Sequence, residues 1–268
     1  MKLNKKILLV GCGNMGSQLL EKWSNEYDVS VIEEDAQVIK RLKKKKINIL
    51  NIQKSNDKNF LYIVLCTKPD DFKNSIEKFE QYIQNGQKII SVMAGLNIKY
   101  IKRLIKCNVN IIRMMPNLYC GLGQGVCGVF CEKPIEKKKI NSLLHNLGHV
   151  IWLNKESDID FITAFFGGAP AYFFLFLETL KKILESNKIT PSLENILILK
   201  LLSATSEYLR INKSSFDKLI SKVASKGGTT EEAINFLNAE NKFYNLLEQA
   251  IDLAKDKSKI LGSKYTKN

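Results

Sequence analysis

The chain has 268 residues, of which 45% are hydrophobic and 25% charged, and its formal net charge is +14. This length allows two domains with buried cores, and the composition is typical of a soluble globular protein rather than a disordered or fibrous one. The positive charge is spread along the chain with few aromatic residues among the lysines, so we expect no nucleic-acid partner.

The six cysteines show no paired C-x-x-C spacing, which is typical of a protein from a reducing compartment. The first residues lead directly into a short strand and a glycine loop, so we expect no signal peptide. An apolar run at residues 161–177 contains Gly167, Gly168 and Pro170 in its first half. It is too short and too interrupted to cross a membrane, so we expect a buried helix and no membrane partner.

The N-terminal stretch combines a strand, a tight turn and a helix. An apolar run at residues 6–10 is followed at once by the glycine-rich motif of residues 11–16, and leucines at helical spacing come next. In this context the glycines let the backbone approach a pyrophosphate at the helix N-terminus. The residues expected to contact a nicotinamide dinucleotide are Gly11, Gly13, Asn14, Met15 and Gly16.

The second expected strand, residues 29–32, ends in an acidic group. Glu33 lies where dinucleotide-binding folds place the residue that accepts hydrogen bonds from the adenosine ribose hydroxyls. Its carboxylate would repel a 2′-phosphate, although Lys40 and Arg41, one or two helical turns further on, partly offset that charge. We therefore expect NADH or NADPH as the cofactor, with Glu33 favouring NADH.

Strands and helices alternate through the rest of the first half. Further strands are expected at residues 60–66, 88–92, 109–112, 124–130 and 149–153, with helices at 70–84, from 97 and from about 134. This pattern indicates a mostly parallel, doubly wound sheet, in which ligands lie beyond the carboxyl ends of the strands. The residues expected beside the cofactor there are Thr67, Lys68, Pro69, Ala94, Gly95 and Asn117. Lys68 is expected to be a loop residue rather than a catalytic amine.

Only helices are expected after residue 157. Their apolar stripes fall at residues 163–184, 192–209, 214–223, 229–237 and 239–261. The fold class is therefore α/β, with a Rossmann-type domain over residues 1–157 and an all-α domain over residues 158–268. The helices at residues 163–184 and 192–209 are apolar on more than one face. This pattern favours a homodimer built through the second domain over a self-contained bundle.

A glycine pair precedes the helix at residues 229–237. We expect Thr229 to be its N-cap and Glu232 to complete a capping box. The backbone N–H groups after Gly227 and Gly228 would then point outward at the positive end of the helix dipole, which suits a carboxylate or phosphate. An ordinary loop and cap is the competing interpretation of this stretch taken alone.

A metal site is not expected. His145 and His149 are four residues apart, but Gly148 is expected to end the helix between them and no third ligand is evident. Cys127 and Cys131 are expected to be strand residues rather than ligands.

Six motifs in chain order together resemble pyrroline-5-carboxylate reductase over nearly the whole chain. They are residues 11–16, 67–69, 91–95, 113–117, 168–172 (followed by an apolar helix with Glu178) and 225–230. The resemblance implies a Rossmann domain followed by a helical dimerisation domain. It also implies that the protein reduces the imine 1-pyrroline-5-carboxylate to L-proline with NAD(P)H, in the last step of proline biosynthesis, in the cytoplasm and as a homo-oligomer.

The resemblance also implies roles for residues 223–230. The glycine loop would hold the substrate carboxylate, and Val223 would pack on the substrate ring. Thr230 would place its hydroxyl near the ring nitrogen and is the implied catalytic residue. The implied substrate-binding residues are Val223, Ser225, Gly227, Gly228, Thr229 and Thr230.

The chain departs from the common family pattern at three places. Phe166 and Gly168 stand where the family commonly has serines, Lys226 stands where it commonly has proline, and residues 118–120 replace a Thr-Pro pair.

Two other functions stay open. One is a related two-domain dehydrogenase or imine reductase; dehydrogenases of this plan usually carry a catalytic lysine on the first long helix of the second domain, where this chain has Tyr172 near the start and Lys181 only well along it. The other is a non-catalytic nucleotide-sensing protein on the same fold.

Overall fold

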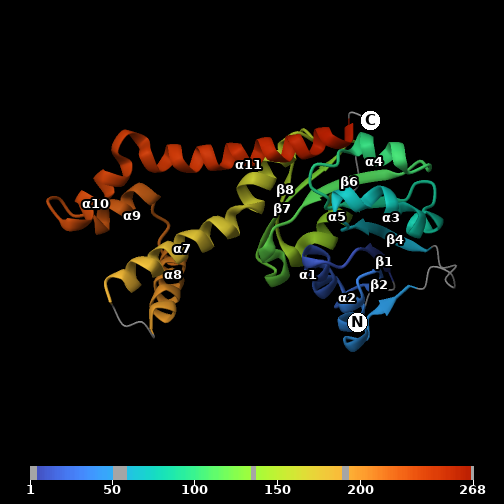
Figure 1. The fold of residues 1–268 in the computed structure, drawn as a ribbon, viewed down its shortest axis with the longest axis horizontal. Coiled ribbons are helices and arrows are strands. Elements are labelled where there is room, and N and C mark those ends of the chain that lie inside the picture. The colour runs from blue at the N-terminus through green and yellow to red at the C-terminus, as the bar shows by residue number, and fades with distance from the viewer. Residues whose placement is uncertain (1–4, 51–58, 134–136, 189–192, 267–268) are drawn as a thin grey trace. The chain divides into compact units, whose positions relative to one another are not determined.

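The computed structural model of the chain describes residues 5–50, 59–133, 137–188 and 193–266. The chain forms two compact units (Figure 1): one combines Met1–Pro170 with Leu253–Asn268, and the other is Ala171–Asp252. This division differs from the predicted limits of 1–157 and 158–268. Residues just after 157 stay with the sheet because they pack on it: Ile159 and Ile162 are buried, and a Cβ on Gly128 would lie 2.7 Å from the Ile162 side chain.

The first unit contains one eight-stranded sheet in the order β3-β2-β1-β4-β5-β6-β7-β8. All neighbouring strands run parallel except β6 and β7, which are antiparallel. The strands are β1 (Lys6–Val10), β2 (Asp28–Ile32), β3 (Asn48–Ile49), β4 (Phe60–Leu65), β5 (Lys88–Ser91), β6 (Asn110–Met115), β7 (Gly125–Cys131) and β8 (Gly148–Trp152). The strand order reverses between β1 and β4, so the ligand crevice of such a sheet lies at the carboxyl ends of these two strands.

Short helices connect the strands of this unit or, in the case of α6, follow the last strand. They are α1 (Asn14–Trp23), α2 (Ala36–Lys44), α3 (Phe72–Phe79), α4 (Ile98–Leu104), α5 (Lys137–Leu144) and α6 (Asp158–Ile162), with 3-10 turns η1 (Pro69–Asp71), η2 (Glu80–Tyr82), η3 (Leu118–Leu122) and η4 (His145–Leu147). The predicted helix at 70–84 is thus α3 between two 3-10 turns. The predicted start of another helix at Pro134 lies outside the described residues.

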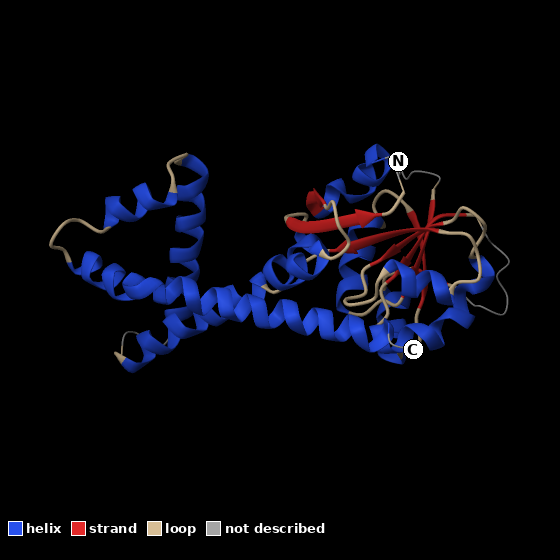
Figure 2. Cartoon of the chain, turned by 90° about the horizontal axis from the view of Figure 1, so that it is seen from above, coloured by secondary structure: helices blue, strands red, loops and turns tan. Residues whose placement is uncertain are grey.

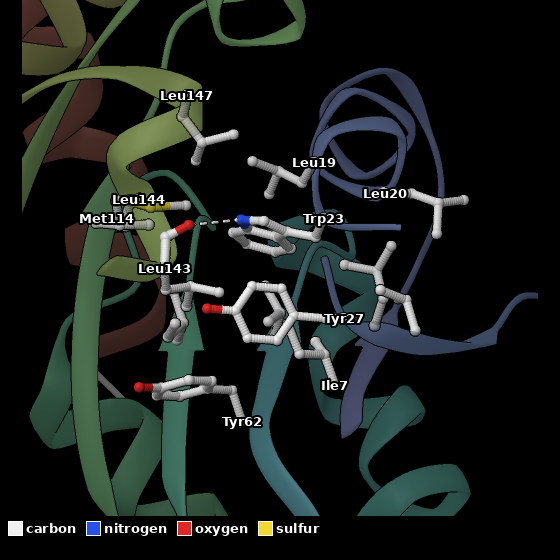
Figure 3. Packing of buried hydrophobic residues seen from close by; sticks show 14 of the residues in the cluster. Ile7, Leu19, Leu20, Trp23, Tyr27, Tyr62, Met114, Leu143, Leu144 and Leu147 are labelled. Atoms are coloured by element: carbon white, nitrogen blue, oxygen red, sulfur yellow. Dashed lines mark hydrogen bonds between the residues drawn. The ribbon is translucent and has the colours of Figure 1, made fainter. Parts of the chain in front are cut away.

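The central strands β1 and β4 are buried on both faces because they are apolar at nearly every position. Ile7 and Leu9 of β1 belong to a cluster with α1 and α5, whereas Leu8 and Val10 belong to a second cluster with α3 and α4. In the first cluster the Trp23 indole donates a hydrogen bond of 2.9 Å to the Leu143 carbonyl (Figure 3). Continuous apolar strands of this kind are typical of parallel sheets covered by helices on both sides.

The described chain after β8 is helical, as predicted (Figure 2). A π-helical turn η5 (Thr163–Gly167) joins α6 to α7 (Ala169–Ser186), and α8 (Glu194–Ile211), α9 (Phe216–Val223) and α10 (Thr229–Asn238) follow. The 3-10 turn η6 (Ala239–Asn241) leads into α11 (Lys242–Thr266), whose first part belongs to the second unit and whose last part belongs to the first. The predicted helix start at Ser192 lies outside the described residues.

The expectation of a buried helix at residues 161–177 is wrong for the single chain. Phe173, Leu175 and Phe176 of α7 are 55%, 67% and 53% exposed, because the second unit supplies no layer that covers them. Within the described residues, the run Asp158–Ser186 is also long and apolar enough to span a membrane by length and composition, a test that core helices of soluble proteins pass as well. Helix α8 is similarly exposed at Ile196, Leu199 and Leu201.

Candidate active site

The glycine loop after β1 has the geometry that a dinucleotide requires. Gly11 has φ = 86°, a left-handed conformation that favours glycine, and its N–H donates to the Ile32 carbonyl at 2.9 Å. A Cβ on Gly16 would lie 2.4 Å from the Gly11 carbonyl oxygen, so only glycine allows α1 to approach the loop this closely. Gly13 has no atom within 4 Å of its Cβ position, which leaves open space over the loop.

Helix α1 points its N-terminus at this open space. Gly13 is the N-cap without a side-chain cap, and the Gly13 carbonyl accepts from the Ser17 N–H at 2.9 Å. The N–H groups of Asn14, Met15 and Gly16 therefore lie in the first turn, where no intrahelical partner exists. These are the groups that hold a pyrophosphate at a helix N-terminus, so the residues present fit a nicotinamide dinucleotide.

Glu33 and Arg41 lie on opposite sides of the Cys12 residue in this loop. The Cys12 N–H donates to Glu33 Oε2 at 2.6 Å, and Arg41 Nη2 donates to the Cys12 carbonyl at 3.4 Å. The other oxygen of Glu33 accepts from the N–H groups of Glu34 and Asp35 at 2.7 and 3.0 Å. The structure thus places a carboxylate and a guanidinium together at the end of β2. Burial, together with the Glu33 charge, raises the pKa of the Cys12 thiol to about 11.

The loop after β4 lies against the glycine loop. A Cβ on Gly11 would be 3.0 Å from the Thr67 nitrogen, and the Cys66 N–H donates to the Val10 carbonyl at 2.8 Å. Lys68 is exposed and precedes η1, so it is a loop residue as predicted, and Pro69 occupies the first position of η1. The Thr67 hydroxyl donates to Met93 Sδ at 3.4 Å, which joins this loop to the loop after β5.

The loop after β5 contains Ala94 and Gly95. Gly95 is buried with φ = 77°, and a Cβ there would lie 2.9 Å from the Gly262 nitrogen in the last turns of α11. Ala94 packs on a small cluster with Ile159 and Ile162 of α6. The predicted cofactor residues after β1, β4 and β5 are therefore neighbours at one edge of the sheet.

Asn117 is held within the chain. It is 4% exposed, its Nδ2 donates to the Phe166 carbonyl at 3.3 Å, and its Oδ1 accepts from the Val126 N–H at 3.1 Å. The side-chain amide thereby joins the end of β6 to β7 and to η5. Its predicted contact with the cofactor stays a prediction, and this bridging role was missed from the sequence.

Two buried thiols lie beside Asn117. The Sγ atoms of Cys120 and Cys127 are 3.5 Å apart, and Cys127 is a strand residue as predicted. Their hydrogen bond lowers the pKa of the Cys120 thiol and raises that of Cys127, which burial raises further. The pair packs η3 against β7.

One of the three family departures, at Phe166 and Gly168, lies at the π-helical turn and its C-terminal cap. Phe166 is the residue whose carbonyl receives the Asn117 amide, and the Gly168 N–H donates to the Thr163 carbonyl at 3.1 Å. Such turns are rare inside helical runs and often occur at functional sites. The residues that replace the family serines therefore belong to a locally widened turn rather than to regular helix.

The glycine–threonine loop differs in detail from the expectation. Gly228, not Thr229, is the N-cap of α10, and it provides no side-chain cap. The carboxylate that accepts from the backbone before the helix belongs to Glu231, not to Glu232. Glu231 Oε2 accepts from the Gly227 N–H at 2.7 Å. The predicted capping box is therefore wrong, because Gly227 adopts φ = 74° and the N-cap lies one residue earlier than expected.

The rest of this loop is held by contacts within its own backbone. The Gly228 N–H donates to the Ser225 carbonyl at 2.9 Å, and a Cβ on Gly228 would lie 2.9 Å from Ser225 oxygens. The N–H groups of Thr229 and Thr230 are in the first turn of α10, without intrahelical partners. Lys226 is exposed.

An apolar groove of about 700 Å³ in the second unit contains two of the predicted substrate residues, Val223 and Thr230. Its other lining residues are Ala204, Thr205, Tyr208, Leu209, Phe216, Leu219, Ile220 and Ile234. Val223 is 70% exposed and Thr230 is half-buried. The structure thus brings the Val223 side chain and the Thr230 hydroxyl to one apolar surface.

The two histidines are separated as predicted. His145 lies in η4 and its Nδ1 is 2.7 Å from the Ser142 carbonyl oxygen, whereas Gly148 begins β8 with φ = 128°. Among the described residues, no three His, Cys, Asp or Glu side chains form a cluster that could hold a metal ion.

Two family models match the chain in succession. Residues 6–95 match the model described as NADP oxidoreductase coenzyme F420-dependent, and residues 156–261 match the model of pyrroline-5-carboxylate reductase dimerisation. The first range covers the glycine loop and the loops after β4 and β5. The second covers α6 to most of α11, including the glycine–threonine loop.

Known proteins are similar over most of the chain. A pyrroline-5-carboxylate reductase of Staphylococcus saprophyticus is 30% identical over 210 residues, 75% of each chain. One of Staphylococcus epidermidis is 27% identical over 278 residues, 97% of this chain and 98% of the relative. The crystal structure of Plasmodium falciparum pyrroline carboxylate reductase with NADP bound shares the fold, with a TM-score of 0.82, 24% identity, and coverage of 98% of this chain and 100% of that one.

Proposed function

The chain belongs to the pyrroline-5-carboxylate reductase family, and we propose from this premise that it reduces 1-pyrroline-5-carboxylate to L-proline with NAD(P)H, in proline biosynthesis. It is an oxidoreductase acting on a C=N bond. The observation that carries this function is the succession, on one chain, of a dinucleotide-binding part at residues 6–95 and the reductase dimerisation part at residues 156–261.

The reduction of an imine by NAD(P)H requires few reactive side chains. NAD(P)H supplies the hydride, and the imine carbon is most electrophilic when its nitrogen is protonated. The protein therefore contributes mainly proximity and orientation. The N–H groups at the start of α1 and the loops after β4 and β5 hold and orient the dinucleotide.

The glycine–threonine loop supplies the substrate contacts of the proposal. The first-turn N–H groups of Thr229 and Thr230 attract the substrate carboxylate, supported by the dipole of α10, which spans Thr229–Asn238. Val223 packs on the ring, and Ser225 fixes the loop through its carbonyl, which accepts from Gly228. The Thr230 hydroxyl donates to the ring nitrogen as it becomes an amine.

The cofactor preference follows from the charges at the end of β2. The Glu33 carboxylate, held 2.6 Å from the Cys12 nitrogen, accepts from ribose hydroxyls and repels a 2′-phosphate, which favours NADH. Arg41 stands on the other side of the same residue and attracts a 2′-phosphate. We therefore propose that the enzyme prefers NADH and also uses NADPH, because Arg41 partly offsets the repulsion of a 2′-phosphate by Glu33.

The chain carries a dimerisation domain, and the exposed apolar faces of α7 and α8 support assembly through these helices. A second copy would cover Phe173, Leu175 and Leu199, which solvent contacts in the single chain. Light scattering coupled to size exclusion should give a mass of two chains or more; a mass of one chain at micromolar concentration would contradict the proposal. The six free cysteines support a cytoplasmic location, which a fluorescent fusion of the full chain would test.

The activity is tested by following NADH and NADPH absorbance with 1-pyrroline-5-carboxylate, and with a 2-hydroxyacid and its keto acid as a control pair. Imine-dependent oxidation of the cofactor with formation of proline is expected. Turnover of the hydroxyacid pair instead would favour a related dehydrogenase. Dinucleotide binding without turnover of any of these compounds would favour a sensor.

A further inference from the structure

The last turns of α11, residues 258–265, belong to the sheet-containing unit and lie beside α4 (Figure 1). Ser258 is 4% exposed and its hydroxyl donates to Asp160 Oδ1 of α6 at 2.7 Å. We call residues 258–265 the C-terminal turns. They contact the two loops that follow β4 and β5, which are the loops assigned above to the cofactor.

The first contact is at Asp70, in the 3-10 turn directly after residues 67–69. Lys264 Nζ and the Tyr265 hydroxyl both donate to Asp70 Oδ1, each at 2.6 Å. These hydrogen bonds hold the pKa of the Asp70 carboxyl below its ordinary value. One carboxylate oxygen thus joins the loop after β4 to the end of the chain.

The second contact is at Gly95, in the loop after β5. A Cβ on Gly262 would lie 2.7 Å from the Gly95 carbonyl oxygen, and a Cβ on Gly95 would lie 2.9 Å from the Gly262 nitrogen. The two backbones therefore touch without side chains between them. Glycine at both positions lets α11 rest directly on the loop.

The third contact holds the end of α11 against α4. The rings of Tyr100 and Tyr265 have centroids 5.7 Å apart, and Arg103 Nη2 donates to the Tyr265 carbonyl at 3.4 Å. The Arg103 guanidinium also lies 5.1 Å from the Tyr100 ring centroid. Tyr265 is therefore held through its hydroxyl, its ring and its carbonyl.

A few residues connect these contacts to the glycine loop after β1. Asp70 is three residues from Thr67, whose nitrogen lies 3.0 Å from the Cβ position of Gly11, and the Thr67 hydroxyl reaches Met93 beside Ala94 and Gly95. A displacement of the η1 turn would therefore move atoms that touch the glycine loop. The match to the dimerisation model ends at residue 261, whereas Gly262, Lys264 and Tyr265 lie beyond it.

We propose that Lys264 and Tyr265 are positioning residues for the cofactor: through Asp70 they hold the loop after β4, while Gly262 holds the loop after β5, in the conformation that receives the nicotinamide dinucleotide. The proposal rests on the proposed function for the assignment of these loops. It predicts that loosening the C-terminal turns weakens binding of the dinucleotide and leaves the chemical step and the imine site unchanged.

The test uses the full chain with Tyr265→Phe combined with Lys264→Met, which removes both donors to Asp70 and keeps the ring and the stem. Dissociation constants for NADH and NADPH are measured by fluorescence titration without imine, and kinetics give KM for the cofactor, KM for the imine and kcat. We expect cofactor dissociation constants to rise roughly fivefold, in line with the loss of two hydrogen bonds at an exposed site. The kcat and the imine KM should stay within about twofold of wild type.

Matched controls lie on the same helix. Tyr244→Phe removes a hydroxyl that donates to Glu248 Oε1 at 2.6 Å. Lys259→Met lies within the C-terminal turns but removes an ammonium whose partner, Asp256 Oδ1 at 3.0 Å, belongs to the same helix and not to a cofactor loop. This control pair loses the same kinds of contact away from the cofactor loops, so its cofactor affinity should equal that of wild type. Asp70→Asn keeps an acceptor for Tyr265 and should retain most of the affinity that Asp70→Ala loses.

Three outcomes would overturn the proposal: an unchanged cofactor affinity in the double variant, an equal loss in the control pair, or a loss of kcat and imine affinity together with cofactor affinity. A lowered Tm with unchanged cofactor affinity would assign the C-terminal turns a purely structural role. Because binding is measured without imine, a wild-type chain that binds NADH but does not reduce the imine would contradict the proposed function and not this inference.

Discussion

Gly95 and Gly262 meet backbone to backbone, with the Gly95 carbonyl oxygen 2.7 Å from the place where a Cβ on Gly262 would stand. One glycine is in the loop after β5 and the other is in the last turns of α11. The contact joins the C-terminus of the chain to the sheet.

Gly262→Ala should therefore destabilise the protein although it lies in a helix. Alanine gains about 1 kcal/mol over glycine in a helix interior, but overpacking against a backbone atom typically costs about 1–3 kcal/mol. Gly167→Ala is the control, since the nearest atom to its Cβ position is 3.8 Å away. Thermal unfolding should show a lower Tm for the first variant only; a raised Tm for Gly262→Ala would contradict the contact.

Thr230→Val should slow imine reduction about tenfold, the loss of roughly one hydrogen bond to a developing amine. The effect should be moderate because a proton from solvent still reaches the nitrogen. Thr230→Ser restores the hydroxyl and should recover most of the rate. Thr229→Val removes the neighbouring exposed hydroxyl but keeps the Thr229 N–H proposed to bind the substrate carboxylate, so it serves as the control. Steady-state kcat with saturating cofactor is the measurement, and an unchanged kcat in Thr230→Val would remove the proposed role.

Glu33→Gln should shift the cofactor preference toward NADPH. The amide oxygen can still accept from the Cys12 N–H, which keeps the contact with the glycine loop. The amide nitrogen can no longer accept from the N–H groups of Glu34 and Asp35, and the charge that repels a 2′-phosphate is lost. Arg41→Gln should act in the opposite direction and weaken NADPH more than NADH. The ratio of kcat/KM for the two cofactors measures both effects, and equal ratios in wild type and both variants would argue against this discriminating pair.

Cys12 should be unreactive toward alkylating reagents in the folded protein at pH 8. Its pKa is raised from 9.0 to about 11, so the thiolate, which is the reactive form, is about 100-fold scarcer than in the unfolded chain. A folded-state pKa above the unfolded one means that folding favours the protonated thiol. The stability contributed by the protonated Cys12 thiol is therefore present below pH 9 and is lost as the pH rises through about 11. Peptide mapping after iodoacetamide treatment, with and without denaturant, measures the difference; the half-buried Cys107 provides an internal comparison.

The sequence predicted the strands well because apolar runs bounded by glycine, proline and lysine mark buried parallel strands. Strand β1 was predicted at its observed limits, and of the strands in the described residues only the two-residue β3 (Asn48–Ile49) was missed. A strand of two residues has too few positions for any periodic pattern. The loops predicted to contact the cofactor were located for the same reason, since they are defined as the residues that follow such strands.

The glycine–threonine loop shows where local patterns fail. Residues 227–232 contain all the signals of a capping box, yet Gly227 with φ = 74° places the N-cap at Gly228 and brings Glu231 to the Gly227 N–H. Two neighbouring glutamates fit the pattern equally well by spacing, and the backbone conformation of one glycine selects between them. A glutamate four residues after the glycine was the available signal.

The sequence by itself determined the order of elements, the dinucleotide loop and the family, because these depend on residues close together in the chain. Only the tertiary structure decided the contacts between distant segments: Asn117 with Phe166, Asp70 with Lys264 and Tyr265, and Gly95 with Gly262. Such contacts leave no periodic pattern in the sequence. The glycine in α11 looked like an ordinary helix residue until the packing of the chain placed a carbonyl oxygen against it.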